Sequence, residues 1–196
     1  MAKISCLLWD FGDTLCDERF IWSSGPEWMA VYETFDNDGP GAQWSLGEID
    51  QHKFSQQISM PLGLPPDAVL AHMIECCHRI KFFEKTFAFF QSMHLPQAIV
   101  TVNPDLFSEV IVPTYDLDKY CEEIVTSWQE HSLDKRVLGR CAMERMGLGA
   151  DIGNALLIDN KLTNVEDWIS AGGAGYHFEG DLKFERDVKN GVIALA

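Results

Sequence analysis

Basic residues are scarce in this chain of 196 residues, which has 15 Lys and Arg against 30 Asp and Glu and a formal net charge of -15. The few basic residues are spread along the sequence and form no basic stretch. A protein that binds a nucleic-acid duplex needs a basic face that neutralises phosphates. We therefore expect no nucleic-acid partner.

Long apolar runs are also absent, because no stretch approaches the roughly 20 apolar residues that span a bilayer. The first ten residues, MAKISCLLWD, lack the basic region, the long apolar stretch and the small-residue cleavage site of a secretory signal. These two absences predict that no segment spans or binds a membrane and that the protein is cytoplasmic.

The sequence has no CxxC motif, a spacing that often marks zinc and redox sites. The neighbouring residues Cys76, Cys77 and His78 cannot converge as tetrahedral zinc ligands unless partners arrive from elsewhere. A chain of this size does not need disulfides for stability, so we expect reduced thiols. The six cysteines are Cys6, Cys16, Cys76, Cys77, Cys121 and Cys141.

The residues that are present are those of an ordinary globular protein, with 46% hydrophobic and 11% aromatic residues. They suffice for one compact domain, or for a core with a modest insert. Short apolar runs that end at polar residues predict buried strands at 4–9, 97–102, 123–126, 155–158 and 176–178. Residues after 178 are expected to add a last strand and helix.

Helical spacing of apolar residues predicts helices over 137–146 and 164–170, and a further helix after Pro104. Residues 18–90 have the pattern of several short helices, interrupted at 36–41 and 60–66. Strands that alternate with helices predict an α/β fold, a Rossmann-like parallel sheet covered on both faces. The helical block would be a small cap inserted into that core.

Polar residues end three of the predicted strands. Asp10 follows the first strand, Thr101 lies at the end of the second, and Asp159 follows the run at 155–158. In open parallel sheets, ligands bind at the carboxyl ends of the strands, near the point where strand order reverses. Asp and Thr also cap turns and helices, so each residue alone has an ordinary structural explanation.

Three motifs in this order resemble those of the haloacid dehalogenase-like (HAD) superfamily. Residues 7–15, LLWDFGDTL, resemble its first motif, in which a strand is followed by Asp, any residue, Asp, Gly, Thr and Leu or Val. Residues 99–103, IVTVN, resemble the second, and residues 156–173, LLIDNKLTNVEDWISAGG, the fourth. The resemblance implies a HAD-like core at 1–16 and 91–196 and a C1-type helical cap at 17–90. Within the cap, residues 44–65 resemble the sugar-phosphatase-like and epoxide-hydrolase-N-domain-like branch.

The resemblance also implies a mechanism. Asp10 would attack phosphorus and form an aspartyl-phosphate, which divides one difficult displacement into two easier ones. A magnesium ion would be bound by Asp10, by Asp159 and by the backbone carbonyl of Gly12, because this ion prefers oxygen ligands. The carbonyl of residue 12 is available whatever its side chain is.

The resemblance assigns the phosphate group to residues at the first two strand ends. Thr101 would donate a hydrogen bond from its hydroxyl, and Phe11, Val102 and Asn103 would bind the substrate. Phe11 and Val102 would do so through their backbone N–H groups. The expected partner is therefore a small phosphorylated substrate.

The third motif of the superfamily is a Lys that balances the charge of the nucleophile and the phosphate, usually just before a Pro. Lys135 lies within a residue or two of the expected position, but no Pro follows it, and Arg136 competes for the role. We predict that Lys135 is catalytic. The alternative is that both residues form a solvated pair at the start of a helix.

Two positions depart from the superfamily pattern. Gly12 stands where phosphatases usually have an Asp that acts as general acid and base, and its loss typically costs about 10²–10⁴ in rate. Asp13 is adjacent, but its side chain is expected to point elsewhere. Asn160 replaces the second Asp of the common Asp-Asp pair, which removes a negative charge near the metal. We therefore expect a millimolar rather than a micromolar requirement for magnesium.

The predicted function is that of a magnesium-dependent phosphatase, a hydrolase that uses an aspartyl-phosphate intermediate. One alternative keeps the fold but gives the chain a binding or regulatory role with little or no catalysis, because fold does not fix function. Another is a haloacid dehalogenase, in which the same Asp attacks carbon without a metal. Asp159 argues against dehalogenation, because dehalogenases of the superfamily lack a metal-binding acid at that position.

Overall fold

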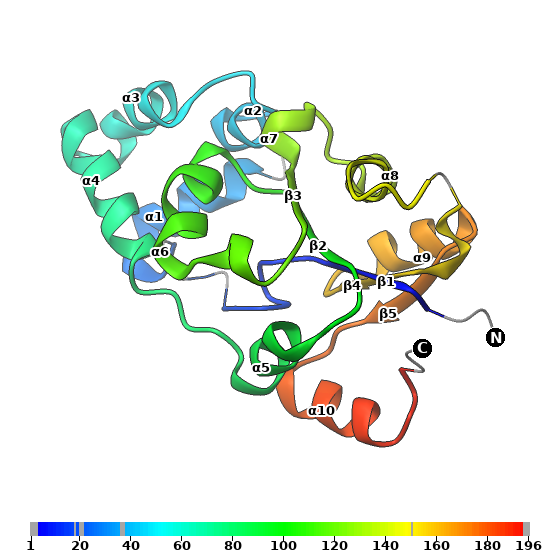
Figure 1. Cartoon of the computed structure of the whole chain (residues 1–196). Helices are drawn as coiled ribbons and strands as arrows, with labels where there is room; N and C mark the ends of the chain where they lie inside the picture. Colours follow the sequence, from blue (N-terminus) through cyan, green and yellow to red (C-terminus); the bar gives the residue numbers. More distant parts are fainter. Residues whose placement is uncertain (1–3, 18, 20–21, 36–37, 150, 194–196) are drawn as a thin grey trace.

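A computed structural model describes residues 4–17, 19, 22–35, 38–149 and 151–193 of the chain. Its centre is a sheet of five strands in the order β3-β2-β1-β4-β5, and every neighbouring pair is parallel (Figure 1). The strands are β1 (Cys6–Trp9), β2 (Gln97–Thr101), β3 (Glu123–Thr126), β4 (Ala155–Asp159) and β5 (Ala174–His177). The predicted α/β class and all five predicted strands are confirmed, with shifts of one or two residues at their ends.

Alternate residues of each central strand pack on opposite faces of the sheet. In β1, Leu7 and Trp9 join the apolar cluster on one face, and Leu8 joins the cluster on the other. Both faces are covered by helices, which is why these strands read as continuous apolar runs. Figure 1 shows α8 (Lys135–Arg145) and α9 (Leu162–Ser170) above the sheet, and α5 (Glu84–Ser92) and α10 (Asp181–Lys189) below it.

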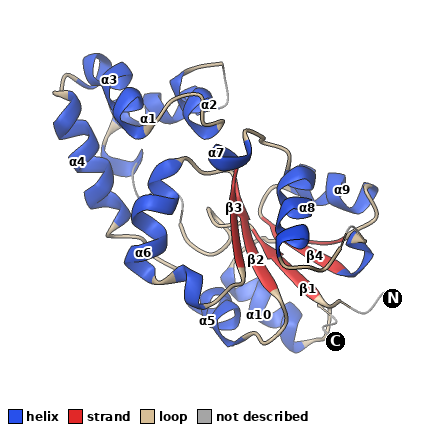
Figure 2. Ribbon diagram, turned by 45° about the horizontal axis from the view of Figure 1, so that its top comes forward, coloured by secondary structure: helices blue, strands red, loops and turns tan. Residues whose placement is uncertain are grey.

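The cap consists of α1 (Pro26–Tyr32), α2 (Pro40–Ser45), α3 (Gln51–Leu62) and α4 (Pro66–Cys77), with short 3-10 turns at Trp22–Ser24 and Glu33–Phe35. Three of these helices begin with proline, which has no N–H to leave unpaired in the first turn. The Asp50 side chain caps α3 by accepting a hydrogen bond from the Lys53 backbone N–H at 2.7 Å. The cap lies beyond the carboxyl ends of the strands (Figure 2).

Most of helix α5 lies inside the range 17–90 that was predicted as cap, yet the helix packs on the core. The Phe90 ring meets the Trp9 ring edge to face at 5.8 Å between centroids. Asp181, the first residue of α10, accepts hydrogen bonds from the backbone N–H groups of Lys85 and Thr86 at 3.1 and 2.7 Å. These N–H groups lie in the first turn of α5 and have no partner within that helix. The end of the cap at residue 90 stays a prediction, and α5 belongs by its contacts to the lower layer.

The remaining elements connect strands to helices. The helix predicted after Pro104 is present in two parts, a wider π-helical stretch at Phe107–Ile111 and α6 (Val112–Tyr115). Helix α7 (Ser127–Glu130) follows β3 directly, and 3-10 turns occupy Leu117–Lys119 and Ile152–Asn154. In residues 178–193 the structure has α10 but no strand, so the last strand expected there was wrong for the described part of the chain.

No disulfide joins the six cysteines, all of which lie in the described part of the chain. None of the helices in that part is both long enough and apolar enough to cross a membrane.

Helix α8 approaches the sheet closely because it has a glycine at its contact point. A Cβ atom added to Gly139 would lie 2.8 Å from Cζ3 of Trp168 and 3.1 Å from Cδ1 of Leu8. Both neighbours are fully buried, so neither has room to move away.

We predict that Gly139→Ala destabilises the protein by about 1 kcal/mol or more, because overpacking outweighs the gain of about 1 kcal/mol that alanine gives in a helix interior. The matched control is Val137→Ala, two residues earlier on the exposed side of α8, which should change stability by less than about 0.5 kcal/mol. Urea unfolding of both variants measures the difference. A stabilised Gly139→Ala protein would contradict the close approach.

Candidate functional site

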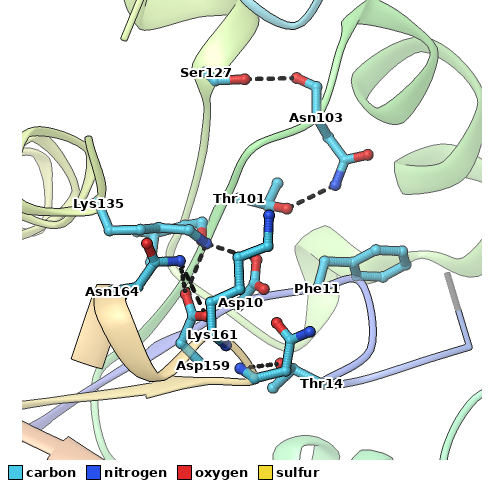
Figure 3. A network of polar contacts seen from close by, with 12 residues as sticks. Asp10, Phe11, Thr14, Thr101, Asn103, Ser127, Lys135, Asp159, Lys161 and Asn164 are labelled. Carbon is cyan, nitrogen blue, oxygen red and sulfur yellow. Dashed lines mark hydrogen bonds and ion pairs between the residues drawn. The ribbon is translucent and has the colours of Figure 1, made fainter. Parts of the chain in front are cut away.

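The polar residues predicted at the strand ends come together at one edge of the sheet. Asp10 follows β1, and Thr101 and Asp159 are the last residues of β2 and β4. Strand β1 lies between β2 and β4, and Trp9 pairs with Ile99 on one side and Ile158 on the other. The next residues along all three strands therefore meet at the carboxyl edge, as Figure 3 shows.

Lys135 connects this edge to helix α8. Its Nζ atom donates hydrogen bonds to Oδ1 of Asp10 at 2.6 Å and to the Val100 carbonyl at 2.6 Å, and it lies 3.2 Å from Oδ2 of Asp159. The side chain of Lys135 is almost completely buried. Arg136 points away and pairs at the surface with Asp134, the N-cap residue of the same helix. Of the two candidate cations, the structure places Lys135 in the site.

The charges in this network do not balance. The pKa of Asp10 is raised to about 6 by all effects together. Burial raises it most, the nearby Lys135 ammonium lowers it, and the Asp159 carboxylate raises it. For Lys135, burial works against the charged form, but the two carboxylates outweigh it and raise the pKa. Two carboxylates therefore share one ammonium in a buried place. The remaining negative charge favours the approach of another cation.

The Asp159 carboxylate is fully engaged within the protein. Its Oδ1 atom accepts hydrogen bonds from the Lys161 backbone N–H at 2.8 Å and from Nδ2 of Asn164 at 3.1 Å. Its Oδ2 atom accepts from the same Asn164 group at 3.0 Å and faces Lys135. These contacts occupy about the four lone-pair positions that a carboxylate offers. To bind a metal directly, Asp159 would have to give up one of these contacts.

Asn160 presents an open oxygen that the sequence did not reveal. Its Oδ1 atom is buried and has no hydrogen-bond partner, while its backbone N–H donates to Oγ1 of Thr14 at 3.1 Å. More than about 90% of buried polar groups have a partner, so an unpaired acceptor at this place fits a ligand that arrives from outside. Sequence reasoning treated Asn160 only as a lost charge. Its position directly after Asp159 was the available signal.

The site opens into a cavity of about 220 Å³ between the core and the cap. Of the predicted site residues, Asp159 is not among those that line it, whereas Asn160, Lys161 and Asn164 are, together with the predicted Asp10, Phe11, Gly12, Thr101, Val102, Asn103 and Lys135. Lys161, a second cation at this end, was also missed by sequence reasoning.

Contacts within the cavity wall leave donors for a bound anion. The Oγ1 atom of Thr101 accepts a hydrogen bond from Nδ2 of Asn103 at 2.7 Å, so its own hydrogen remains for an acceptor in the cavity. The Phe11 ring packs against Phe107 at 4.8 Å, which keeps that side chain in the wall. The contribution of Phe11 to an anion would be its backbone N–H.

The cap is held over the cavity by buried hydrogen bonds. The Trp44 indole N–H and the Gln51 backbone N–H donate to the two oxygens of Asp105, at 2.6 and 2.9 Å. The Ser127 hydroxyl donates to the Ser45 carbonyl at 2.6 Å. Because Asp105 follows β2 and Ser127 follows β3, the same strand ends position both the polar floor and the cap above it.

The first motif has Asp and then Gly after the second residue, whereas this chain has Gly12 and then Asp13. Asp13 has φ 51°, the left-handed region that favours glycine, whereas Gly12 is not among the described glycines with positive φ. The backbone at residue 12 therefore does not require glycine, and residue 13 tolerates Asp where glycine would be easier. Gly12 lines the cavity and Asp13 does not. Among the described residues that line the cavity, Asp10 is the only carboxylate, so none of them provides a second one that could act as an acid.

The oxygens around Asp10 suit a hard cation. No group of three or more His, Cys, Asp and Glu side chains that could hold a metal occurs among the described residues. A metal here would instead depend on the Asp10 carboxylate, the Gly12 carbonyl and the unpaired Oδ1 of Asn160. Carboxylate, carbonyl and amide oxygens with water in the remaining positions are the ligands that magnesium accepts. The residues present therefore fit this ion.

Comparison with known proteins finds no family model and no curated protein that matches the sequence. Solved structures do match. A HAD family enzyme from Bacteroides thetaiotaomicron, in complex with magnesium and inorganic phosphate, is 17% identical, with a TM-score of 0.72 over 90% of this chain and 95% of that one. A predicted HAD-like family hydrolase from Porphyromonas gingivalis is 14% identical, with a TM-score of 0.76 over 98% and 99% of the two chains.

The L-2-haloacid dehalogenase from Xanthobacter autotrophicus is also similar, at 13% identity and a TM-score of 0.66 over 97% of this chain and 84% of that one. At these identities the likeness shows the fold. The chain therefore has the HAD-like fold that its motifs predicted, and the chemistry must be argued from the site.

We predict that Lys135→Met destabilises the metal-free protein by about 3–5 kcal/mol at neutral pH, because it leaves two buried carboxylates without their cation. The control Arg136→Met removes an adjacent, exposed cation and should cost less than about 1 kcal/mol. Without Lys135, the folded carboxylates hold protons to a higher pH than the unfolded ones. The destabilisation should therefore shrink as the pH falls toward 4.

Urea unfolding in EDTA at several pH values measures both effects. Equal losses for the two variants, or a loss at Lys135 that does not change with pH, would contradict the buried charge network.

Proposed function

We propose that this chain, which has the fold of the HAD superfamily, is a magnesium-dependent phosphohydrolase that acts on a small phosphorylated metabolite through an aspartyl-phosphate on Asp10. The observation that carries the proposal is the environment of Asp10, a buried carboxylate bound to Lys135 at the floor of a cavity that Thr101 also lines. The Bacteroides enzyme of the same fold, crystallised with magnesium and inorganic phosphate, supports it.

In the proposed first step, a carboxylate oxygen of Asp10 attacks phosphorus, and the bond from phosphorus to the leaving-group oxygen breaks with its electron pair. A pKa near 6 leaves Asp10 mostly ionised at neutral pH, and Lys135 fixes its orientation. Thr101 donates its hydroxyl hydrogen to a phosphate oxygen, and the N–H groups of Phe11 and Val102, with Asn103, hold the others.

In the second step, water attacks phosphorus and releases inorganic phosphate, which restores the Asp10 carboxylate. Residues Asp10, Gly12 (through its carbonyl) and Asn160 would hold magnesium, and Asp159 stays a predicted ligand. When bound, the ion would supply positive charge that offsets the repulsion between the carboxylate and the phosphate. Asp159 would hold Lys135 in place through their ion pair, and Asn164 would hold Asp159 through its amide hydrogen bonds.

We predict that the protein releases inorganic phosphate from at least one of a panel of acyl phosphates, sugar phosphates, nucleotides and a chromogenic ester. EDTA should abolish release, and Asp10→Asn should lower kcat at least 10³-fold, because the amide is not a nucleophile. The variant Asp134→Asn, at the surface beside Arg136, is the matched control and should keep its activity.

Activity that survives Asp10→Asn would overturn the proposed mechanism. Magnesium binding without turnover of any substrate would favour the alternative of a binding or regulatory role.

We predict that Asn160→Asp binds magnesium at least tenfold more tightly than the wild type, because a carboxylate replaces a neutral oxygen ligand. Titration calorimetry on both proteins measures the dissociation constants, and the wild-type value should be millimolar. The control Asn190→Asp adds the same charge at the exposed end of α10. If both variants bind magnesium equally, Asn160 does not contact the ion.

A further inference from the structure

The end of the cavity away from Asp10 is lined mainly by aromatic rings. The cap provides most of them, and they contact one another, with the Phe35 ring 5.2 Å from Trp22 and 6.2 Å from Trp44 between centroids. Within the described part of the chain, the aromatic residues that line the cavity are Phe11, Trp22, Tyr32, Phe35, Trp44 and Phe107. Such a wall offers apolar surface and ring faces to whatever the phosphate is attached to.

The part of this wall that the structure describes has few polar groups, which are the hydroxyls of Tyr32 and Ser45, the Trp44 indole N–H and the Cys77 thiol. Among the described residues of the cap that line the cavity, none is charged, and burial raises the pKa of the Cys77 thiol to about 12, so it stays neutral. The Trp44 indole N–H is already bound to Asp105. The several hydroxyls of a sugar would lose more hydrogen bonds to water here than these few groups replace, which disfavours binding.

The cavity is large enough for a ring together with a phosphate group. Its volume of about 220 Å³ exceeds the roughly 150 Å³ of an engineered apolar cavity that binds benzene in another protein. The charged lining residues, Asp10, Lys135 and Lys161, all lie at the phosphate end. A cavity with a charged end and an aromatic end fits a molecule that has a phosphate group at one end and an aromatic ring at the other.

A second observation concerns the leaving group. Gly12 provides no side chain that could protonate it, and Asp13 does not line the cavity. An alkoxide, whose conjugate alcohol has a pKa near that of water at about 15.7, leaves slowly without an acid. A phenolate leaves far more readily, because phenols such as the tyrosine side chain have a pKa of about 10. The missing acid therefore favours substrates whose leaving group needs no proton.

These two observations rest on different residues and agree. Given the proposed phosphohydrolase function, we propose that the substrate is a phosphate monoester of a phenol, with the aromatic ring held between the cap and core rings and the phosphate at Asp10. Asp10 forms a bond to phosphorus, the bond to the phenolic oxygen breaks, and the phenolate takes a proton from water. Hydrolysis of the aspartyl-phosphate then consumes one water and yields inorganic phosphate.

Four substrates separate the effect of the ring from that of the leaving group. Phenyl phosphate has both an aromatic ring and a good leaving group, and benzyl phosphate has the ring with an alkoxide leaving group. Acetyl phosphate has a good leaving group without a ring, and ethyl phosphate has neither. We expect a KM at least tenfold lower for the two ring substrates than for the two without a ring, and a kcat/KM at least 100-fold higher for phenyl phosphate than for benzyl phosphate.

Variants test each half of the proposal. Gly12→Asp should raise kcat/KM for benzyl phosphate at least 100-fold and change that for phenyl phosphate less than tenfold, because kcat/KM reports the first step, in which only the alkoxide needs the acid. Phe35→Leu should raise KM for both ring substrates at least fivefold, and by a larger factor than for acetyl phosphate, which has no ring to contact Phe35. Phe89→Leu is its control, since Phe89 packs on Trp9 and Phe184 away from the cavity.

Free phosphotyrosine and a tyrosine-phosphorylated peptide are two further substrates, which distinguish a small phenolic metabolite from a protein-borne one. Turnover of either, with the KM pattern above, supports the proposal. Magnesium-dependent turnover of acetyl phosphate alone, or of ethyl phosphate as fast as phenyl phosphate, would overturn the phenolic substrate and leave the phosphohydrolase standing. No turnover of any of these compounds, while a sugar phosphate or nucleotide of the wider panel is hydrolysed, would overturn only the phenolic substrate, and no turnover of the whole panel would overturn both.

Discussion

The buried ammonium group of Lys135 is the contact on which both the fold and the site depend. It joins α8 to three strands of the sheet, through Asp10 after β1, Val100 in β2 and Asp159 at the end of β4. Two carboxylates that are buried next to each other repel, and burying them lowers the stability of the folded protein unless a cation and good hydrogen bonds compensate. The same charge that stabilises the pair keeps Asp10 ionised, so structural and chemical requirements coincide at one atom.

Most of the fold could be predicted from the sequence, because strands buried on both faces leave continuous apolar runs between turn residues. The layer to which a helix belongs could not. Helix α5 has the same apolar spacing as the cap helices, and the contacts that place it on the core come from residues far away in the sequence, Trp9 and Asp181. Lys135 was predicted as the catalytic cation, but the sequence did not exclude Arg136, because the direction of each side chain depends on where α8 begins. The helix begins at Lys135, two residues before the predicted start, since Asp134 caps it.

The positions of the polar residues at the strand ends predicted which side chains meet in the site, and the motifs added their expected roles. Adjacent parallel strands in register bring Asp10, Thr101 and Asp159 together whatever their roles are. What the motifs could not tell is how the oxygens are shared. Asp159 accepts from backbone, amide and ammonium groups, whereas the amide oxygen of Asn160 is left open. That division depends on Asn164 and on the local backbone, and no spacing in the sequence encodes it.

The acidity of the chain and its proposed anionic substrate are compatible because charge acts locally. A net charge of -15 repels a phosphate at long range, but at physiological salt this field decays over about 8 Å. Inside the cavity, the nearest charges include Lys135 and Lys161, and the walls beyond them are aromatic. An anion with a polar body would gain little from such walls, whereas an apolar body gains by leaving water. Affinity must therefore come from the ring end of the substrate and orientation from the phosphate end. A cavity with this division, and without an acid at Gly12, selects by the chemistry of the leaving group rather than by hydrogen bonds to it.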